Sequence, residues 1–172
     1  MNTERTSVYA GFLELPTKKA FEPFGNLYPI SLVRQMAFEA VKTAFFHSPA
    51  YAVVGASKDQ TKYGTKVLQW YKAREMPVTP VHPKETELEG IAAVKSIEEL
   101  PSPSTTSISI ITPSKITIDL LQKAKELNVP ALWIQPGASD SACINFIKEN
   151  DMVDKVIYGG SCVLIEGDNF RK

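Results

Sequence analysis

Apolar residues follow two different periods along the chain, and the two periods predict alternating helices and strands. In some segments apolar residues recur every three to five positions, as on one face of an α-helix. These segments are 31–46, 61–75, 113–127 and 141–150. Between them lie short, largely apolar runs, most of them next to glycine or proline, which is typical of buried strands. These runs are 51–55, 77–81, 107–111, 131–134, 155–158 and 162–165. The run at 107–111 shows partial alternation of serine and isoleucine.

The order of these elements predicts one α/β domain with a doubly wound, mostly parallel sheet. The connections are short, and consecutive strands joined through a helix normally form right-handed crossovers. We assign residues 36–172 to this domain and residues 1–35, which show no clean periodicity, to an N-terminal extension. A polar connection over 85–97 and a short helical turn at 96–100 precede the third strand. In such sheets ligands bind beyond the carboxyl ends of the strands, near the switch in strand order.

Composition narrows the classes of protein to consider. The chain has 172 residues, of which 44% are apolar, with 19 basic and 19 acidic residues. A formal net charge of zero argues against general affinity for nucleic acid or anionic membranes, and no apolar run approaches the roughly 20 residues that span a bilayer. Two cysteines, Cys143 and Cys162, are too few for a disulfide framework, and no secretory signal pattern precedes the domain. We expect a cytoplasmic protein, with a mitochondrial location left open.

The loop after the first predicted strand suits a diphosphate. Gly55 lets the backbone approach a ligand, Ser57 offers a hydroxyl, and the following helix presents the free N–H groups of its N-terminus. Lysines surround this loop at positions 58, 62 and 66. The loop lacks the G-x-G-x-x-G dinucleotide fingerprint, because its second glycine, Gly64, comes nine residues after the first. A plain strand-to-helix turn with solvated lysines explains the same residues.

Basic residues follow the second predicted strand, in the segment His82-Pro83-Lys84. A dinucleotide site places an acidic residue here to bind the ribose 2′-hydroxyl. A cationic side chain instead favours a ligand whose ribose carries an extra phosphate, and Lys84 is the stronger candidate. His82 is explained equally well as a surface imidazole without a role.

Later turns complete the candidate cleft. Thr112-Pro113 follows the third strand and Gln135-Pro136-Gly137 follows the fourth, although a helix start and a tight turn also account for these residues. Cys162 follows the glycine pair 159–160. It is expected to be a small buried residue, or alternatively a thiol that faces the ligand.

Taken in order, these segments resemble the CoA-binding domain family, the stand-alone relatives of the CoA-binding domain of succinyl-CoA synthetase and ADP-forming acyl-CoA synthetases. The matching segments are A-V-V-G-A-S…K-Y-G at 52–64, V-T-P-V-H-P-K at 78–84, E-G at 89–90, I-T-P-S at 111–114, W-I-Q-P-G-A at 133–138, and the closing G-G-S-C-V-L. The resemblance implies a Rossmann-like fold that binds CoA or an acyl-CoA.

The resemblance also implies a role for each loop. The glycine–serine loop would hold the CoA diphosphate, the 82–84 segment would lie near the adenosine 3′-phosphate, and the pantetheine arm would run toward the turns at 112–113 and 135–137. The expected cofactor-binding residues are Gly55, Ala56, Ser57, Lys62, Tyr63, Gly64, His82, Pro83, Lys84, Thr112, Pro113, Gln135, Pro136 and Gly137.

The sequence offers no complete set of catalytic residues. It contains no G-x-S-x-G motif, no H-E-x-x-H motif and no Cys/His cluster at metal-binding spacing. Acyl-CoA synthetases of the resembling type also need a ligase domain with a phosphorylated histidine and an ATP-grasp domain, for which this chain has no room. We therefore expect a non-catalytic CoA sensor, carrier or accessory protein. The alternatives are an NAD(P)- or other nucleotide-binding protein, with Lys84 on an NADP 2′-phosphate, and one half of a composite site completed by a synthetase-type partner chain.

Overall fold

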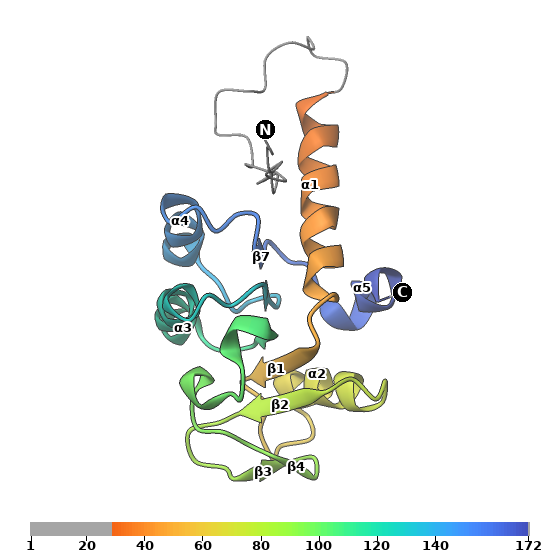
Figure 1. The fold of residues 1–172 in the computed structure, drawn as a ribbon, viewed down its shortest axis with the longest axis vertical. Coiled ribbons are helices and arrows are strands. Elements are labelled where there is room, and N and C mark those ends of the chain that lie inside the picture. The colour runs from red at the N-terminus through yellow and green to blue at the C-terminus, as the bar shows by residue number, and fades with distance from the viewer. Residues whose placement is uncertain (1–28, 172) are drawn as a thin grey trace, which may run out of the picture.

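A five-stranded parallel sheet forms the centre of the protein, in the order β2-β1-β5-β6-β7 (Figure 1). The computed structural model describes residues 29–171. The sheet consists of β1 (Ala50–Val54), β2 (Val78–Val81), β5 (Thr106–Ile110), β6 (Leu132–Ile134) and β7 (Val156–Ile157). A separate antiparallel hairpin consists of β3 (Glu87–Leu88) and β4 (Ile91–Ala92). The hairpin turns at Glu89 and Gly90, both with positive φ, inside the segment predicted to be a plain polar connection.

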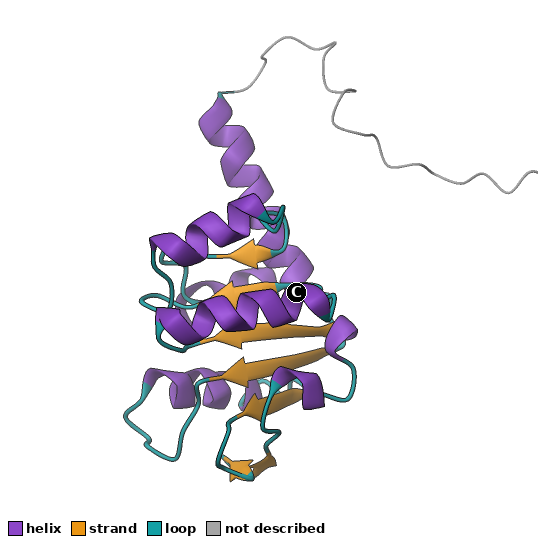
Figure 2. Ribbon diagram, turned by 90° about the vertical axis from the view of Figure 1, so that its left-hand side faces the viewer, coloured by secondary structure: helices purple, strands orange, loops and turns teal. Residues whose placement is uncertain are grey.

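Helices cover both faces of the sheet (Figure 2). One face packs against α1 (Ile30–Phe45), α2 (Tyr63–Lys72) and α5 (Val163–Phe170). The other packs against α3 (Ser114–Glu126), α4 (Ser141–Glu149) and the short 3₁₀ turn η1 (Ile97–Glu99). A second 3₁₀ turn, η2 (Pro103–Thr105), leads into β5. The predicted doubly wound parallel α/β fold is thus confirmed.

Alternation along the strands divides the apolar residues between two cores. In β1, Ala52 and Val54 belong to the core under α3 and α4, whereas Tyr51 and Val53 belong to the core under α1 and α2. The second core is rich in aromatic rings around the fully buried Trp133, whose ring packs edge-on against Phe45. Burial on both faces explains why most of these strands are largely apolar rather than alternating. In β5 the alternate residues Ser107 and Ser109 are also fully buried, and their hydroxyls bond to Ser48 and Tyr71.

The order of the strands reverses between β1 and β5. The chain passes from β1 through α2 to β2 on one side, and then returns to form β5 on the other side of β1. The carboxyl ends of β1 and β5 therefore flank the switch point, where a doubly wound sheet leaves room for a ligand.

The predicted strand at 162–165 is wrong, because Cys162 is the N-cap of α5, which begins at Val163. A short apolar run fits a buried strand or a buried helical turn equally well. Here Glu166 stabilises the start of the helix, because its Oε1 accepts hydrogen bonds from Ser161 Oγ and Cys162 N. Gly167 continues the buried face, since a Cβ there would lie 2.7 Å from the Trp70 ring.

The predicted boundary between extension and domain, between residues 35 and 36, falls inside helix α1, which begins at Ile30. The rest of the predicted extension, residues 1–28, lies outside the described residues. The N-terminal turns of α1 extend beyond the sheet in both views (Figures 1 and 2). Within residues 29–171, no helix combines the length and apolarity needed to cross a membrane.

Candidate functional site

At the switch point, the loops that leave β1 and β5 touch. Gly55 has φ +107°, and a Cβ on it would lie only 2.3 Å from the carbonyl oxygen of Ile111. The ladder between the two strands continues to this point, because Ile111 N donates to Val54 O at 2.8 Å. Glycine is thus required at position 55 both by its backbone conformation and by this close approach.

The loop after β1 also rests on the N-terminus of α2. A Cβ on Gly64 would lie 2.1 Å from the Gly55 carbonyl oxygen. The fully buried Thr65 fixes the loop, because its Oγ1 donates to Ser57 O at 2.8 Å and accepts from Ser57 N at 3.2 Å. The first turn of α2 carries no acidic residue, so the positive end of its dipole is not neutralised. Among the described residues, Ala56 N–H donates to no other group.

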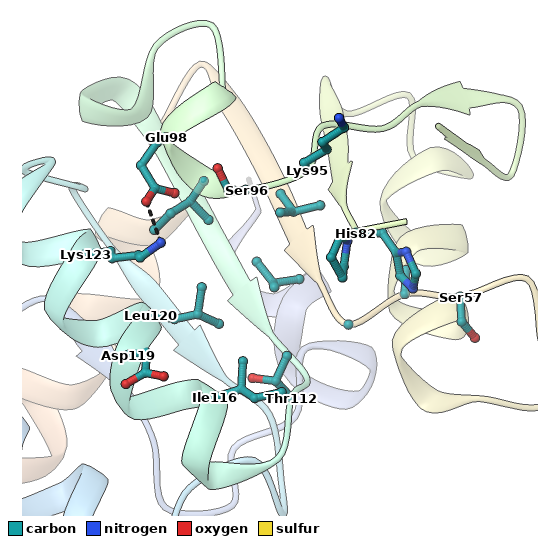
Figure 3. Close-up of a pocket in the computed structure, with 16 residues that line it drawn as sticks. Ser57, His82, Lys95, Ser96, Glu98, Thr112, Ile116, Asp119, Leu120 and Lys123 are labelled. Carbon is teal, nitrogen blue, oxygen red and sulfur yellow. Dashed lines mark ion pairs between the residues drawn. The ribbon is translucent and has the colours of Figure 1, made fainter. Parts of the chain in front are cut away.

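A pocket of about 470 Å³ opens beside this loop, at the carboxyl ends of β1, β2 and β5 (Figure 3). Its apolar side chains come from the strand ends, η1 and α3, and its polar side chains stand around them. It is lined by Val54, Gly55, Ala56, Ser57, Val81, His82, Pro83, Lys95, Ser96, Ile97, Glu98, Thr112, Ile116, Asp119, Leu120 and Lys123. An apolar slot with a polar rim suits a flat, partly polar group such as a heterocyclic base.

His82 stands on one wall of the pocket with a fixed tautomer. Its Nδ1 accepts hydrogen bonds from Lys84 N at 3.2 Å and from Glu85 N at 3.0 Å. Both bonds require an unprotonated Nδ1, so the ring proton resides on Nε2, which is left as a donor. Glu85 in turn pairs with Lys58, which joins this segment to the loop after β1.

Charged side chains form the rim at η1 and α3. Glu98 and Lys123 make an ion pair, and hydrogen bonding to the Lys123 ammonium holds the pKa of the Glu98 carboxyl below its ordinary value. Lys95 lines the same pocket and makes no ion pair with any described residue. Figure 3 shows Lys95 and His82 on one side of the pocket, with Glu98 and Lys123 on the other.

The residues predicted from the sequence divide into two sets. Those that line the pocket are Gly55, Ala56, Ser57, His82, Pro83 and Thr112. Those outside it are Lys62, Tyr63, Gly64, Lys84, Pro113, Gln135, Pro136 and Gly137. Gly64 lies outside the pocket but packs against the loop after β1, at the carbonyl oxygen of Gly55. The pocket residues from η1, α3 and the segment before η1 were not predicted, because their approach to the strand ends is a matter of tertiary packing.

Two of the residues outside the pocket, Tyr63 and Gln135, each contact the N-terminus of α5. The Tyr63 hydroxyl and the Cys162 sulfur share a hydrogen bond at 2.5 Å, and burial together with this bond raises the pKa of Tyr63 to about 12. Gln135 is 1% exposed, and its Oε1 accepts from Val163 N at 3.0 Å. Its Nε2 is buried without a partner among the described residues. Cys162 is therefore buried, as expected, and its sulfur contacts Tyr63.

Among residues 29–171, no group of three or more histidine, cysteine, aspartate or glutamate side chains could hold a metal ion.

Comparison with known proteins gives matches at three levels. A family model described as "CoA binding domain" matches residues 49–168. The alpha subunit of ADP-forming acetate–CoA ligase II from Pyrococcus furiosus is 34% identical over 91 residues, which are 52% of this chain and 20% of that protein. The chain thus spans about a fifth of the length of this curated relative.

Solved structures agree with the fold. A conserved hypothetical protein from Pyrococcus furiosus superposes with a TM-score of 0.62 and 31% identity, covering 68% of this chain and 97% of that one. A hypothetical protein from Pyrococcus horikoshii gives a TM-score of 0.68 at 17% identity, covering 87% of this chain and all of that one.

Proposed function

This chain belongs to the CoA-binding domain family, and from that premise we propose that its switch-point pocket binds the adenosine end of CoA or an acyl-CoA. The observation that carries the proposal is the pocket of about 470 Å³ beside a loop that only glycine can form. Its apolar interior, with Ile97, Ile116 and Leu120, suits an adenine ring.

The diphosphate of CoA would lie over the loop that follows β1. The free Ala56 N–H and the N-terminus of α2 offer donors and a positive dipole end, both suited to phosphate. Ser57 lines the pocket at the same place and can add its hydroxyl. CoA would supply a thiol that carries the acyl group; the side chains of this protein bind and orient it.

Lys95 is our candidate for the adenosine 3′-phosphate, ahead of the predicted Lys84. Lys95 lines the pocket on the same side as His82, makes no ion pair with a described residue, and so has its charge available (Figure 3). Lys84 is exposed and does not line the pocket. His82, whose Nδ1 accepts from the backbone, would add its Nε2–H as a further donor to phosphate or ribose oxygens.

The pantetheine arm would run toward the N-terminus of α5. Gln135 has a buried Nε2 that lacks a partner there, and a buried unpartnered donor costs about 1–3 kcal/mol. An amide carbonyl of pantetheine would satisfy this donor. We assign the protein a role as a sensor, carrier or accessory protein without a reaction of its own, because the described side chains that line the pocket include no nucleophile hydrogen-bonded to a base, and Glu98 pairs with Lys123.

Parallel titrations of the full chain with CoA, 3′-dephospho-CoA and NADP⁺ by calorimetry test this function. We expect CoA to bind, and loss of the 3′-phosphate to weaken binding by about tenfold, which is roughly 1.4 kcal/mol. Lys95→Ala should erase that difference, whereas the matched Lys84→Ala should keep most of it. Preferential binding of NADP⁺ would favour an NAD(P)-binding protein, and no CoA binding at millimolar concentration would refute the proposal.

A composite synthetase-type site is the second candidate function. It is favoured by the match to a ligase subunit of which this chain spans about a fifth. In that case the chain would bind CoA for a partner that carries the ligase or ATP-grasp chemistry. Co-purification of the tagged chain with such a partner supports this candidate, and its absence favours a stand-alone role.

A further inference from the structure

Helix α1 is more apolar than its place in the fold requires. At about 100° per residue, its apolar positions extend around well over half of the circumference, whereas one packing contact needs a stripe of about 100°. Val41 and Phe45 face the core of this domain and are buried. Phe38 is half-buried against the same core. Five other apolar side chains of the helix are exposed and continue that face around it: Leu32, Met36, Ala37, Ala40 and Ala44. Met36 is 63% exposed.

The exposed face of α1 borders a groove of about 1050 Å³. The groove runs between α1 and α4 and is lined by Ala37, Phe38, Ala40, Val41, Ala44, Ile144, Lys148, Val153, Asp154 and Tyr158. It lies beside β7, the last strand of the sheet, so it continues the apolar layer beyond the sheet's edge. Short helices are only marginally stable in water without packing, so a packing partner would also stabilise the projecting turns of α1.

We propose that this groove is the interface of a two-fold symmetric dimer, in which the α1–α4 surface of one copy packs against the same surface of a second copy. The groove carries one basic and one acidic side chain, Lys148 and Asp154, and neither makes an ion pair with a described residue. In a two-fold arrangement each surface meets itself, so the lysine of each copy can pair with the aspartate of the other.

Other features of the chain agree with self-association. Its formal net charge is zero, so two copies experience no long-range repulsion. Alanines at positions 37, 40 and 44 repeat every three to four residues, which places small side chains along one line and permits close approach of a second helix. This interface lies on elements other than the switch-point loops, so the inference goes beyond the proposed function and does not depend on it.

Light scattering after size exclusion measures the mass of the full chain at about 1–100 µM, which covers the affinities of typical stable dimers. We expect the mass of two chains for the wild type and of one chain for Ala40→Glu, which places a charge in the groove. Ile165→Glu is the matched control, because Ile165 is 79% exposed on α5, outside the groove, and it should remain dimeric. Far-ultraviolet circular dichroism confirms that each variant is folded.

A charge swap tests the symmetry. Lys148→Asp and Asp154→Lys each place like charges opposite one another and should raise the dissociation constant by about tenfold or more, whereas the double variant should restore it. A monomeric wild type overturns the proposal, including the case in which residues 1–28 of the same chain cover the groove. A dimer that survives Ala40→Glu, or a double variant that fails to restore it, overturns this interface as well.

Discussion

Gly55→Ala tests whether the close approach of β1 and β5 builds the site. The new Cβ would lie 2.3 Å from Ile111 O, whereas real Cβ contacts essentially never fall below 3.0 Å. The two loops must therefore separate by about 0.7 Å or more, which strains the hydrogen bond from Ile111 N to Val54 O. A φ of +107° adds strain of its own for any residue with a Cβ.

The expected loss of stability follows from these two costs. Backbone strain contributes about 1–3 kcal/mol and a weakened backbone hydrogen bond about 1 kcal/mol, so Gly55→Ala should lower the free energy of unfolding by about 2–4 kcal/mol. For a chain of this size, that corresponds to a fall in Tm of about 5–15 °C.

Gly137→Ala is the matched control for the clash. Gly137 also has a positive φ, +82°, but a Cβ there would meet nothing within 4 Å. It should lose only about 1 kcal/mol, from backbone conformation alone. Chemical denaturation of both variants measures the difference. Equal losses in the two would refute the argument that contact with Ile111 makes glycine necessary at position 55.

Two further predictions concern buried polar contacts. Glu166→Gln breaks the contact with the buried Lys42 and should cost about 1–2 kcal/mol near neutral pH. Burial raises the pKa of Glu166, but the Lys42 ammonium outweighs burial, so the pKa in the folded protein is below its ordinary value of 4.5. The stabilisation is therefore present above pH 4.5 and is lost as the pH falls through the pKa of the folded protein. The difference in unfolding free energy between wild type and variant should therefore shrink on acidification; a constant difference would contradict the assignment. Tyr71→Phe removes the 2.9 Å hydrogen bond to the fully buried Ser109 hydroxyl and should cost about 1–2 kcal/mol, much of which the added Ser109→Ala should recover. Additive losses in that double-mutant cycle would show that the two hydroxyls do not interact.

The sequence predicted best those features that depend on residues close to one another in the chain. The loop from Gly55 to Gly64 joins a strand directly to a helix, and its glycines mark the two places where backbones touch. The parallel sheet also followed from local patterns, because strands buried on both faces are largely apolar. Such signals depend on neighbours in the chain and need no knowledge of the distant contacts.

Residues brought together by packing could not be found in this way. Glu98 and Lys123 meet on one side of the pocket, yet one belongs to η1 and the other to α3. Lys95 lies in the segment predicted to be a polar connection. The β3–β4 hairpin, which was not predicted, returns the chain to the pocket that Lys95 and His82 both line. The error at 162–165 has a different origin, because its four apolar residues fit either period and the deciding hydrogen bonds come from Glu166 beyond the run.

The periodicity of α1 was read correctly as helical, but it did not say which apolar side chains meet the core. Leu32, Met36 and Ala40 are apolar positions of the predicted helical segment 31–46, and they are exposed. The pattern shows that much of the helix surface is apolar. The structure shows that the rest of the domain buries only part of that surface.

A pocket-blocking variant tests most directly whether CoA occupies the switch-point pocket. Ile116 lines this pocket and is 50% exposed, so Ile116→Trp can fill the slot at little cost to folding. Ile165→Trp adds the same ring on α5, away from the pocket. Calorimetric titration with CoA should give a dissociation constant raised at least about tenfold for Ile116→Trp and unchanged for Ile165→Trp. Wild-type affinity in Ile116→Trp would contradict the account.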